Sequence, residues 1–222
     1  MCGRFTLSKP VRAVADLFRL AEPPAELRPR YNVAPSQLIA VVVLKPDGRT
    51  RGLAQLRWGF VSRHSDTPNP KVRPINAKAE SVAYREPFRE SFRDRRCLVP
   101  TDGFYEWSSR DGAKAAYHFR PPGNELMAFA GVWDRWDGPG GPILSCAILT
   151  VAAVAPVKEY HDRMPLILPP DRWDAWLDPA SKVADLMPLL SPPPPGYLEA
   201  VRVGSAVNSP RNDGPECLAP AA

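Results

Sequence analysis

Hydrophobic residues in this chain occur in short runs that predict strands rather than long helices. The run from Leu38 to Leu44 is continuous and rich in β-branched residues, which is typical of a buried strand. The turn sequence Pro46-Asp47-Gly48 comes next, so we expect a hairpin whose second strand covers residues 51–60. Further apolar runs bring the predicted total to about six or seven strands, at 97–100, 117–120, 126–132, 143–151 and 198–203.

Helical periodicity is confined to short segments near the two ends of the chain. Ser8-Lys9-Pro10 resembles an N-cap followed by a first-turn proline. The helix that it would begin has one apolar face, made of Val11, Val14, Leu17 and Phe18. Shorter helices are expected around 81–84, 171–177 and 181–190. With no repeat and no domain boundary, the pattern predicts one α+β domain with a mixed, barrel-like β core and short flanking helices.

Composition agrees with short elements and rigid connections. The 222 residues include 28 prolines, more than twice the usual proportion. Residues 62–74 form a long, polar, proline-rich stretch, and loops of this length are often functional. A net charge of +5 is compatible with an anionic partner such as nucleic acid, but solvated surface charge explains it equally well.

Cysteine and histidine spacing excludes several kinds of site. The four cysteines are far apart and form no C-x-x-C pair, so neither a zinc site nor a redox motif is indicated. The three histidines are not at metal-ligand spacing, and we expect no metal and no cofactor. The start of the chain lacks a signal peptide, and no apolar run is long enough to cross a membrane. We therefore expect a soluble, cytoplasmic protein.

The first residues carry the most distinctive chemistry. Cys2 becomes the N-terminus if Met1 is removed, and it then carries an α-amine and a thiol on adjacent carbons. Their ordinary pKa values are about 7.7–8.0 and about 8.5, so both are partly available as nucleophiles at neutral pH. The alternative is an ordinary cysteine near a frayed chain end, and the first five residues alone do not decide between the two.

Two residues further along could move protons. Glu106 lies among Phe104, Tyr105 and Trp107, and a carboxylate that points inward there would have a raised pKa. Strand alternation would instead turn Glu106 toward water. His161 stands in a polar cluster before an apolar run and could shuttle protons, or it could be a structural histidine bonded to the backbone.

Asn76 and Arg4 complete the set of candidate site residues. Asn76 precedes a predicted helix, so its side chain could cap that helix or orient a nucleophile. Arg4 lies two residues from Cys2, and its guanidinium suits a phosphate or a carboxylate.

Eight short blocks follow one another in the sequence. They are M-C-G-R-F at 1–5, R-Y-N-V-A-P at 30–35, W-G-F at 58–60, P-I-N-A-K-A-E at 74–80, D-G-F-Y-E-W at 102–107, I-L-T at 148–150, H-D-R-M-P at 161–165 and A-V-N-S-P-R-N at 206–212. In this order the blocks closely resemble the SOS-response-associated peptidase family, also called the abasic-site-processing or SRAP domain. The resemblance extends from residue 2 to about residue 217.

This resemblance implies a protein that crosslinks covalently to abasic sites in single-stranded DNA. A monomer suffices for one lesion, so we expect a monomer, and we expect no membrane partner. The α-amine of mature Cys2 would form a Schiff base with the open sugar, and the thiol would close a thiazolidine. It implies that Asn76 positions Cys2, that Glu106 handles protons during Schiff-base formation, and that His161 serves ring opening and reversal. It also implies two kinds of DNA contact. Phosphates would be bound by Arg4, Lys78, Arg85 and Arg163. The path of the strand would be lined by Pro35, Trp58 and Thr150, with stacking on exposed bases.

Two departures from the family pattern and three other functions stay open. Lysine replaces a common arginine at position 78, and residues 61–66 lack a tryptophan that often stacks on DNA in the family. The chain could instead be an N-terminal-cysteine glutamine amidotransferase, although position 4 is arginine and no ammonia-acceptor domain is evident. A self-processing peptidase or a non-catalytic module that binds single-stranded DNA is also compatible with the sequence.

Overall fold

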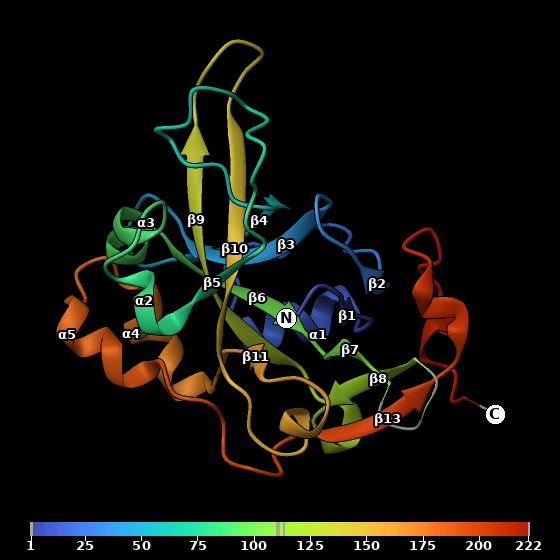
Figure 1. Ribbon diagram of the computed structural model, residues 1–222. Helices are drawn as coiled ribbons and strands as arrows, with labels where there is room; N and C mark the ends of the chain where they lie inside the picture. Colours follow the sequence, from blue (N-terminus) through green and yellow to red (C-terminus); the bar gives the residue numbers. More distant parts are fainter. Residues whose placement is uncertain (1, 110–111, 113, 222) are drawn as a thin grey trace.

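The computed structural model describes residues 2–109, 112 and 114–221, and it places them in two β-sheets with short helices around them (Figure 1). In this part of the chain, one sheet has five strands in the order β13-β8-β7-β1-β2, and the other has eight, in the order β11-β10-β4-β3-β6-β9-β12 with β5 beside β10. The strands are β1 (Phe5–Leu7), β2 (Arg30–Val33), β3 (Leu38–Leu44), β4 (Arg51–Trp58), β5 (Asn76–Lys78), β6 (Arg96–Thr101), β7 (Gly103–Ser108), β8 (Ala115–Arg120), β9 (Met127–Trp136), β10 (Ile143–Ala152), β11 (Arg163–Pro165), β12 (Ile167–Leu168) and β13 (Glu199–Val203).

The predicted α+β class with a mixed, barrel-like core is confirmed. Strand β10 is the reason that the larger sheet is mixed, because it pairs in parallel with β4 and β5 and antiparallel with β9 and β11. The predicted hairpin of β3 and β4 is also confirmed. The predicted number of strands is wrong, since the described residues form 13. The missed strands, such as β1, β2 and β5, have only three or four residues, which is too short to show an alternating pattern.

Short helices cover the sheets, and most of them lie on one side of the molecule (Figure 1). The α-helices are α1 (Val11–Phe18), α2 (Ala79–Val82), α3 (Arg89–Asp94), α4 (Trp173–Leu177) and α5 (Val183–Leu186). Single 3-10 turns lie at Pro122–Asn124, Val157–Glu159, Pro170–Arg172, Met187–Leu189, Ser205–Asn208 and Pro215–Leu218. Helix α4 is held by Trp176, whose indole nitrogen donates to the carbonyl of Cys97 in β6 at 2.9 Å.

The start of α1 differs from the prediction. Its N-cap is Pro10, without a side-chain capping bond, whereas the Ser8 hydroxyl donates to Asp102 Oδ2 at 2.5 Å. The buried face of α1 also differs, because Ala15 is buried and Leu17 is 36% exposed. Ser8 therefore fixes the end of β1 rather than the start of the helix.

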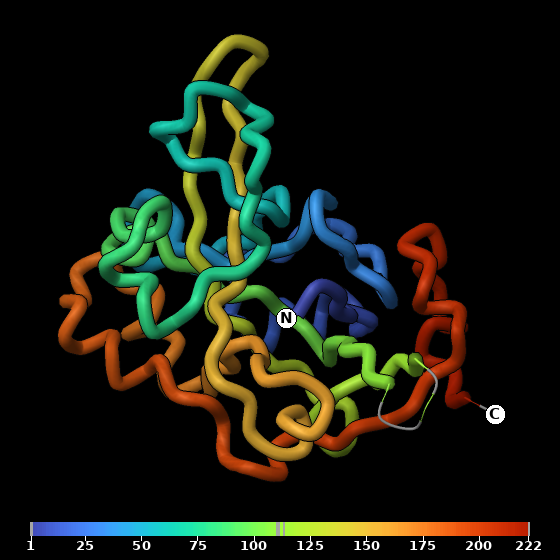
Figure 2. The backbone as a smooth tube through the Cα atoms, viewed as in Figure 1, coloured from blue at the N-terminus to red at the C-terminus, as the bar shows by residue number. Residues whose placement is uncertain are grey.

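A long hairpin of β9 and β10 projects from the core, and residues 61–74 run beside it (Figures 1 and 2). Two contacts hold them together. The indole nitrogen of Trp136 donates to the carbonyl of Ser65 at 2.7 Å, and Arg63 Nε donates to Asp134 Oδ1 at 3.0 Å. The proline-rich loop is thus fixed along the hairpin, next to the segment that leads into β5.

Candidate functional site

Cys2 and Asn76, which lie far apart in the sequence, meet at the start of β1. Cys2 is fully buried, and Asn76 opens β5 opposite Ile148 of β10. Asn76 Nδ2 donates to the carbonyl oxygen of Cys2 at 2.9 Å, while the buried Asn76 Oδ1 has no hydrogen-bond partner among the described residues. Lys78, not Asn76, is the N-cap of α2, so the capping alternative is wrong. The amide of Asn76 instead holds the backbone of Cys2.

Glu106 lies inside the protein, in contrast to the alternative in which it faces water. It is 5% exposed on β7, and burial raises the pKa of its carboxyl group above the ordinary 4.5. Burial also raises the pKa of the Cys2 thiol, and the negative charge of nearby Glu106 adds to that shift. At neutral pH the site therefore favours a protonated thiol beside a carboxyl group that keeps its proton longer than usual.

His161 completes the group around Cys2. It follows the turn Val157–Glu159, and its Nδ1 accepts a hydrogen bond from the backbone nitrogen of Arg163 at 2.8 Å. Nδ1 also lies 3.2 Å from the carbonyl oxygen of Arg163, so the backbone of Arg163 fixes the orientation of the imidazole ring. The positive charge of His161 works against the burial that raises the pKa of Glu106, so the two groups are close enough to interact. The structure thus brings together the four residues predicted to be catalytic, Cys2, Asn76, Glu106 and His161.

Arg4 is half-buried, and its guanidinium contacts other parts of the protein. Its Nη1 donates to Asn32 Oδ1 at 2.7 Å and to the carbonyl of Val207 at 3.1 Å, and its guanidinium lies 5.5 Å from the centre of the Trp107 ring. These contacts tie β1 to β2 and to the C-terminal segment. These contacts involve Nη1, so we assign Arg4 a positioning role, and the expected phosphate contact stays a prediction.

Two residues expected along the DNA path are buried. The Trp58 ring is fully buried, and its indole nitrogen donates to the carbonyl of Ile75 at 2.9 Å. It therefore offers no face on which a base could stack. Thr150 is also fully buried, and its hydroxyl donates to the carbonyl of Ala77 at 3.4 Å. Both residues hold the segment around Asn76 through their bonds to Ile75 and Ala77. Pro35 is partly exposed.

The remaining expected phosphate contacts fall into two groups. Lys78 and Arg85 are exposed at β5 and just after α2. Arg163 is half-buried and forms two hydrogen bonds with the carboxylate of Glu80, at 2.5 and 2.9 Å. Its positive charge is therefore already compensated in this structure, and a phosphate would have to compete with Glu80.

Sequence reasoning missed a buried cluster that fixes β1, formed by Thr6, Ser8, Asp102 and His118 and called the β1 anchor below. Asp102 accepts hydrogen bonds from the Thr6 hydroxyl and, at 2.7 Å, from the Ser8 backbone nitrogen. His118 Nε2 lies 3.1 Å from the Thr6 hydroxyl oxygen. Since the single Thr6 hydrogen goes to Asp102, His118 is the donor in that contact.

The β1 anchor also explains the glycine of the D-G-F-Y-E-W motif. A Cβ on Gly103 would lie 2.2 Å from His118 Nε2, so only glycine lets the imidazole approach Thr6. Burial lowers the pKa of His118 to about 3, and the charge of Arg120 adds to the shift, so the ring is neutral. The D-G pair was visible in the sequence, but its partners come from β1 and β8 and could not be inferred from local spacing.

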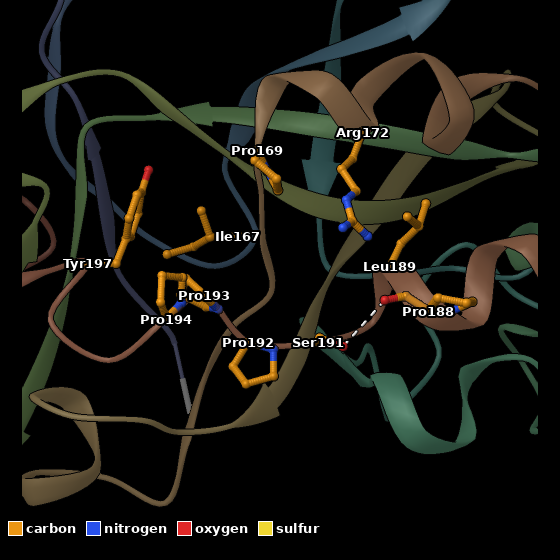
Figure 3. Close-up of a pocket in the computed structure, with 10 residues that line it drawn as sticks. All are labelled: Ile167, Pro169, Arg172, Pro188, Leu189, Ser191, Pro192, Pro193, Pro194 and Tyr197. Atoms are coloured by element: carbon orange, nitrogen blue, oxygen red, sulfur yellow. Dashed lines mark hydrogen bonds between the residues drawn. The ribbon is translucent and has the colours of Figure 1, made fainter.

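A hollow on another face of the molecule is separate from this site (Figure 3). It has a volume of about 270 Å³, and its wall is mainly proline and aliphatic, with Arg172 and Tyr197 as its largest polar residues. It contains none of the four residues around Cys2. Among the described residues, no cluster of histidine, cysteine, aspartate or glutamate could hold a metal ion, and no helix is long and apolar enough to cross a membrane.

Comparison with known proteins identifies the family. A family model described as SOS response associated peptidase (SRAP) matches residues 1–210, and the chain belongs to this family. The abasic site processing protein YoqW of Bacillus subtilis is 36% identical, and the alignment covers 98% of this chain and 99% of YoqW. The abasic site processing protein HMCES of Gallus gallus is 31% identical, with 87% of this chain and 66% of HMCES covered.

Solved structures agree with this assignment at the level of the fold. A protein from Bacteroides thetaiotaomicron superimposes with a TM-score of 0.87 at 21% identity, and the match covers 100% of both chains. A protein from Bordetella bronchiseptica has a TM-score of 0.78 at 25% identity, with 91% of this chain and 100% of that chain covered. The two sheets and their short helices are therefore shared with experimentally determined proteins.

Proposed function

We propose that this protein processes abasic sites in single-stranded DNA by forming a covalent crosslink through Cys2 after Met1 is removed. The observation that carries the proposal is the hydrogen bond from Asn76 Nδ2 to the carbonyl of Cys2, which fixes residue 2 beside Glu106 and His161. Its relatives YoqW and YoaM of Bacillus subtilis are both named abasic site processing proteins. A buried thiol, a buried carboxyl group and an imidazole at the chain start suit chemistry on an aldehyde.

The proposed reaction forms one ring and releases one water molecule. The α-amine of Cys2 attacks the C1′ aldehyde of the open deoxyribose, and loss of water from the addition product gives a C=N bond. The nitrogen of that bond keeps the proton of the former amine. The thiol then adds to the carbon, so that sulfur bonds to C1′, the π electrons return to nitrogen and the thiol proton passes to the carboxylate of Glu106. The five-membered thiazolidine has no iminium, and strand cleavage by β-elimination is therefore suppressed.

Glu106 and His161 supply proton transfers in this scheme. The raised pKa of Glu106 suits it to donate a proton to the departing hydroxyl group and to recover one from the thiol as the ring closes. His161, whose ring is oriented by the backbone of Arg163, suits opening of the sugar ring and reversal of the adduct. Asn76 contributes by fixing the carbonyl of Cys2, which limits the positions that its amine and thiol can reach.

A self-processing peptidase is the second candidate, and the description of the family supports it. In that reaction the Cys2 thiol would act on the peptide bond that follows Met1. Burial raises the pKa of this thiol, which disfavours the thiolate that such an attack requires. Mass spectrometry of protein made in a cell-free system without aminopeptidase tests this candidate. Met1 would still be lost if the protein processes itself, and it would be retained if Met1 removal depends on an aminopeptidase.

The test is a denaturing gel after incubation with single-stranded DNA that contains one abasic site. Protein that begins at Cys2 is expected to give a heat-stable protein–DNA band, and Cys2→Ala is expected to give none. Cys146→Ala, which removes another fully buried thiol in β10, serves as the matched control and should retain the band. A stable adduct with Cys2→Ala would rule out the ring, and loss of the thiazolidine with retained strand cleavage is expected for Cys2→Ser.

A further inference from the structure

Arg57 and Arg73 form a pair of like charges near the Cys2 site. Arg57 is on β4, and Arg73 is in the loop that leads into β5. Arg57 Nη1 lies 3.5 Å and Arg73 Nη1 lies 3.2 Å from the same oxygen, Asn69 Oδ1. The neutral amide of Asn69 thus holds two guanidinium groups within reach of one small anion.

Three other half-buried arginines of the described residues have a carboxylate partner, whereas half-buried Arg4 is bonded to the Asn32 side chain and the Val207 carbonyl. Arg30 pairs with Asp213, Arg120 with Glu199 and Arg163 with Glu80. Neither Arg57 nor Arg73 has a carboxylate within ion-pair distance among the described residues, although both are only partly exposed. Partial burial lowers the pKa of Arg57, and the positive charge of Arg73 adds a smaller shift in the same direction. Two guanidinium groups that contact the same amide oxygen repel each other when no carboxylate compensates their charge, and an anion between them would relieve the repulsion.

The register of β10 places the pair relative to Asn76. Arg57 lies opposite Ser145 and Asn76 lies opposite Ile148, and both strands that carry them run parallel to β10. Three residues of strand correspond to about 10 Å. A DNA strand rises about 3.4 Å per nucleotide in a duplex and more when it is extended, so this distance corresponds to at most about three nucleotides.

We propose that Arg57 and Arg73 together bind one backbone phosphate of the DNA, within about three nucleotides of the sugar that reacts with Cys2. The proposal depends on the proposed function for its ligand, but binding to undamaged DNA is measured separately from the crosslink. Loop 61–74 lacks a tryptophan, so its contribution to the DNA path is a charged clamp rather than a stacking ring. The hairpin contacts of Arg63 and Trp136 hold this loop in position.

The first experiment measures affinity for undamaged, fluorescently labelled single-stranded DNA over a range of KCl concentrations. Arg57→Gln, Arg73→Gln and the double variant are compared with Arg12→Gln, a control on α1 whose side chain is 91% exposed. Loss of one phosphate contact is expected to reduce the slope of log affinity against log salt by about 0.7. The double variant is expected to reduce the slope by at least that amount, and Arg12→Gln is expected to leave the slope almost unchanged. Unchanged slopes in both single variants and in the double variant would overturn the proposal.

A second experiment locates the phosphate. Single-stranded oligonucleotides that contain one abasic site carry one neutral methylphosphonate at successive positions on either side of that site. The wild-type protein should lose affinity at one position within about three nucleotides of the abasic site used in the crosslinking gel. The double variant should lose no further affinity there. A methylphosphonate effect of equal size in the double variant would contradict the assignment.

Thermal unfolding separates a binding defect from misfolding. Because the two guanidinium groups repel each other, the double variant should unfold at the same temperature as the wild type or at a higher one. A lower midpoint would show that the pair stabilises the fold and would contradict the clamp. If undamaged DNA is bound with the expected salt slope but no crosslink forms, the chemistry at Cys2 fails and the clamp stands.

Discussion

At the residue scale, burial determines the chemistry available around Cys2. Glu106 is 5% exposed and Cys2 fully buried, so both groups favour their neutral forms. Trp58 shows a different outcome, since its full burial leaves no ring face free for DNA. The same residue types would act differently at the surface, and their roles follow from which neighbours cover them.

Glu106→Gln is predicted to slow crosslinking while stabilising the fold. The amide has the size of the carboxyl group but cannot transfer a proton, so the rate of adduct formation should fall by about 100-fold or more. The rate is followed on denaturing gels at several times under saturating DNA. A variant with the wild-type rate would remove Glu106 from the proposed proton transfers.

The stability effect of this substitution depends on pH in a definite direction. Because the folded pKa of Glu106 lies above the ordinary 4.5, the folded protein keeps a proton that the unfolded chain has lost. The stability of the wild type therefore falls as the pH rises from 4.5 toward the folded pKa. Glu106→Gln lacks this loss, so its advantage in free energy of unfolding should grow over that range in urea titrations. A difference that is constant with pH would contradict the raised pKa.

At the scale of single elements, β1 is the strand that directly follows the segment with the reactive residue Cys2, and it has only three residues. It pairs with β2 and β7, and the β1 anchor fixes its far end through Asp102. Arg4 fixes the near end through Asn32 and Val207. A strand this short does not hold a position by its ladder alone, so these side-chain contacts determine where Cys2 lies.

Asp102→Asn is predicted to loosen β1 and to slow crosslinking. Asp102 is 1% exposed and accepts hydrogen bonds from Thr6 on one oxygen and from Ser8 on the other. The substitution replaces one of these oxygens with an NH2 group that cannot accept, so the bonds on that side are lost. We expect a loss of about 2–4 kcal/mol in the free energy of unfolding, since buried charge-assisted hydrogen bonds are broken. Urea denaturation provides the measurement. Asp16→Asn, an exposed carboxylate on α1, is the control and should change stability little, and an equal loss in both variants would contradict the anchor.

The sequence predicted long elements well and packing between distant segments poorly. The strand from Leu38 to Leu44 was predicted with its observed ends because a continuous apolar run identifies it. Burial of Trp58 could not be predicted, because it depends on the carbonyl of Ile75 and on β10. The pairing of Arg163 with Glu80 was also invisible, since the two residues are 83 positions apart in the chain.

At the scale of the whole molecule, the C-terminal segment closes the five-stranded sheet over the β1 region. Asp213 accepts hydrogen bonds from the backbone nitrogens of Tyr31 and Asn32, each at 2.8 Å. Asn32 in turn donates to carbonyls of the same segment, including that of Asn212 at 2.8 Å. In Figure 1 this segment lies beside β2, β8 and β13 at one side of the molecule. Residues near both ends of the chain thus form one packed unit.

Asp213→Ala is predicted to release this segment. The substitution leaves two backbone N–H groups and Arg30 without their acceptor, and we expect a loss of about 2–3 kcal/mol in stability. Limited proteolysis should then cut within residues 205–218 faster than in the wild type. Asp185→Ala, at an exposed position in α5, is the matched control. Equal cleavage rates in the two variants would show that Asp213 does not hold the segment.

The most direct test of the central claim compares two forms of one protein. One form carries a removable tag before Cys2, and the other begins at Cys2 after tag cleavage. Only the second has the free α-amine that the proposed thiazolidine requires. Each is incubated with single-stranded DNA containing one abasic site and analysed by intact mass spectrometry. The account predicts that the cleaved protein alone gains the mass of the DNA minus one water molecule, and a tagged protein that gains the same mass to the same extent would contradict it.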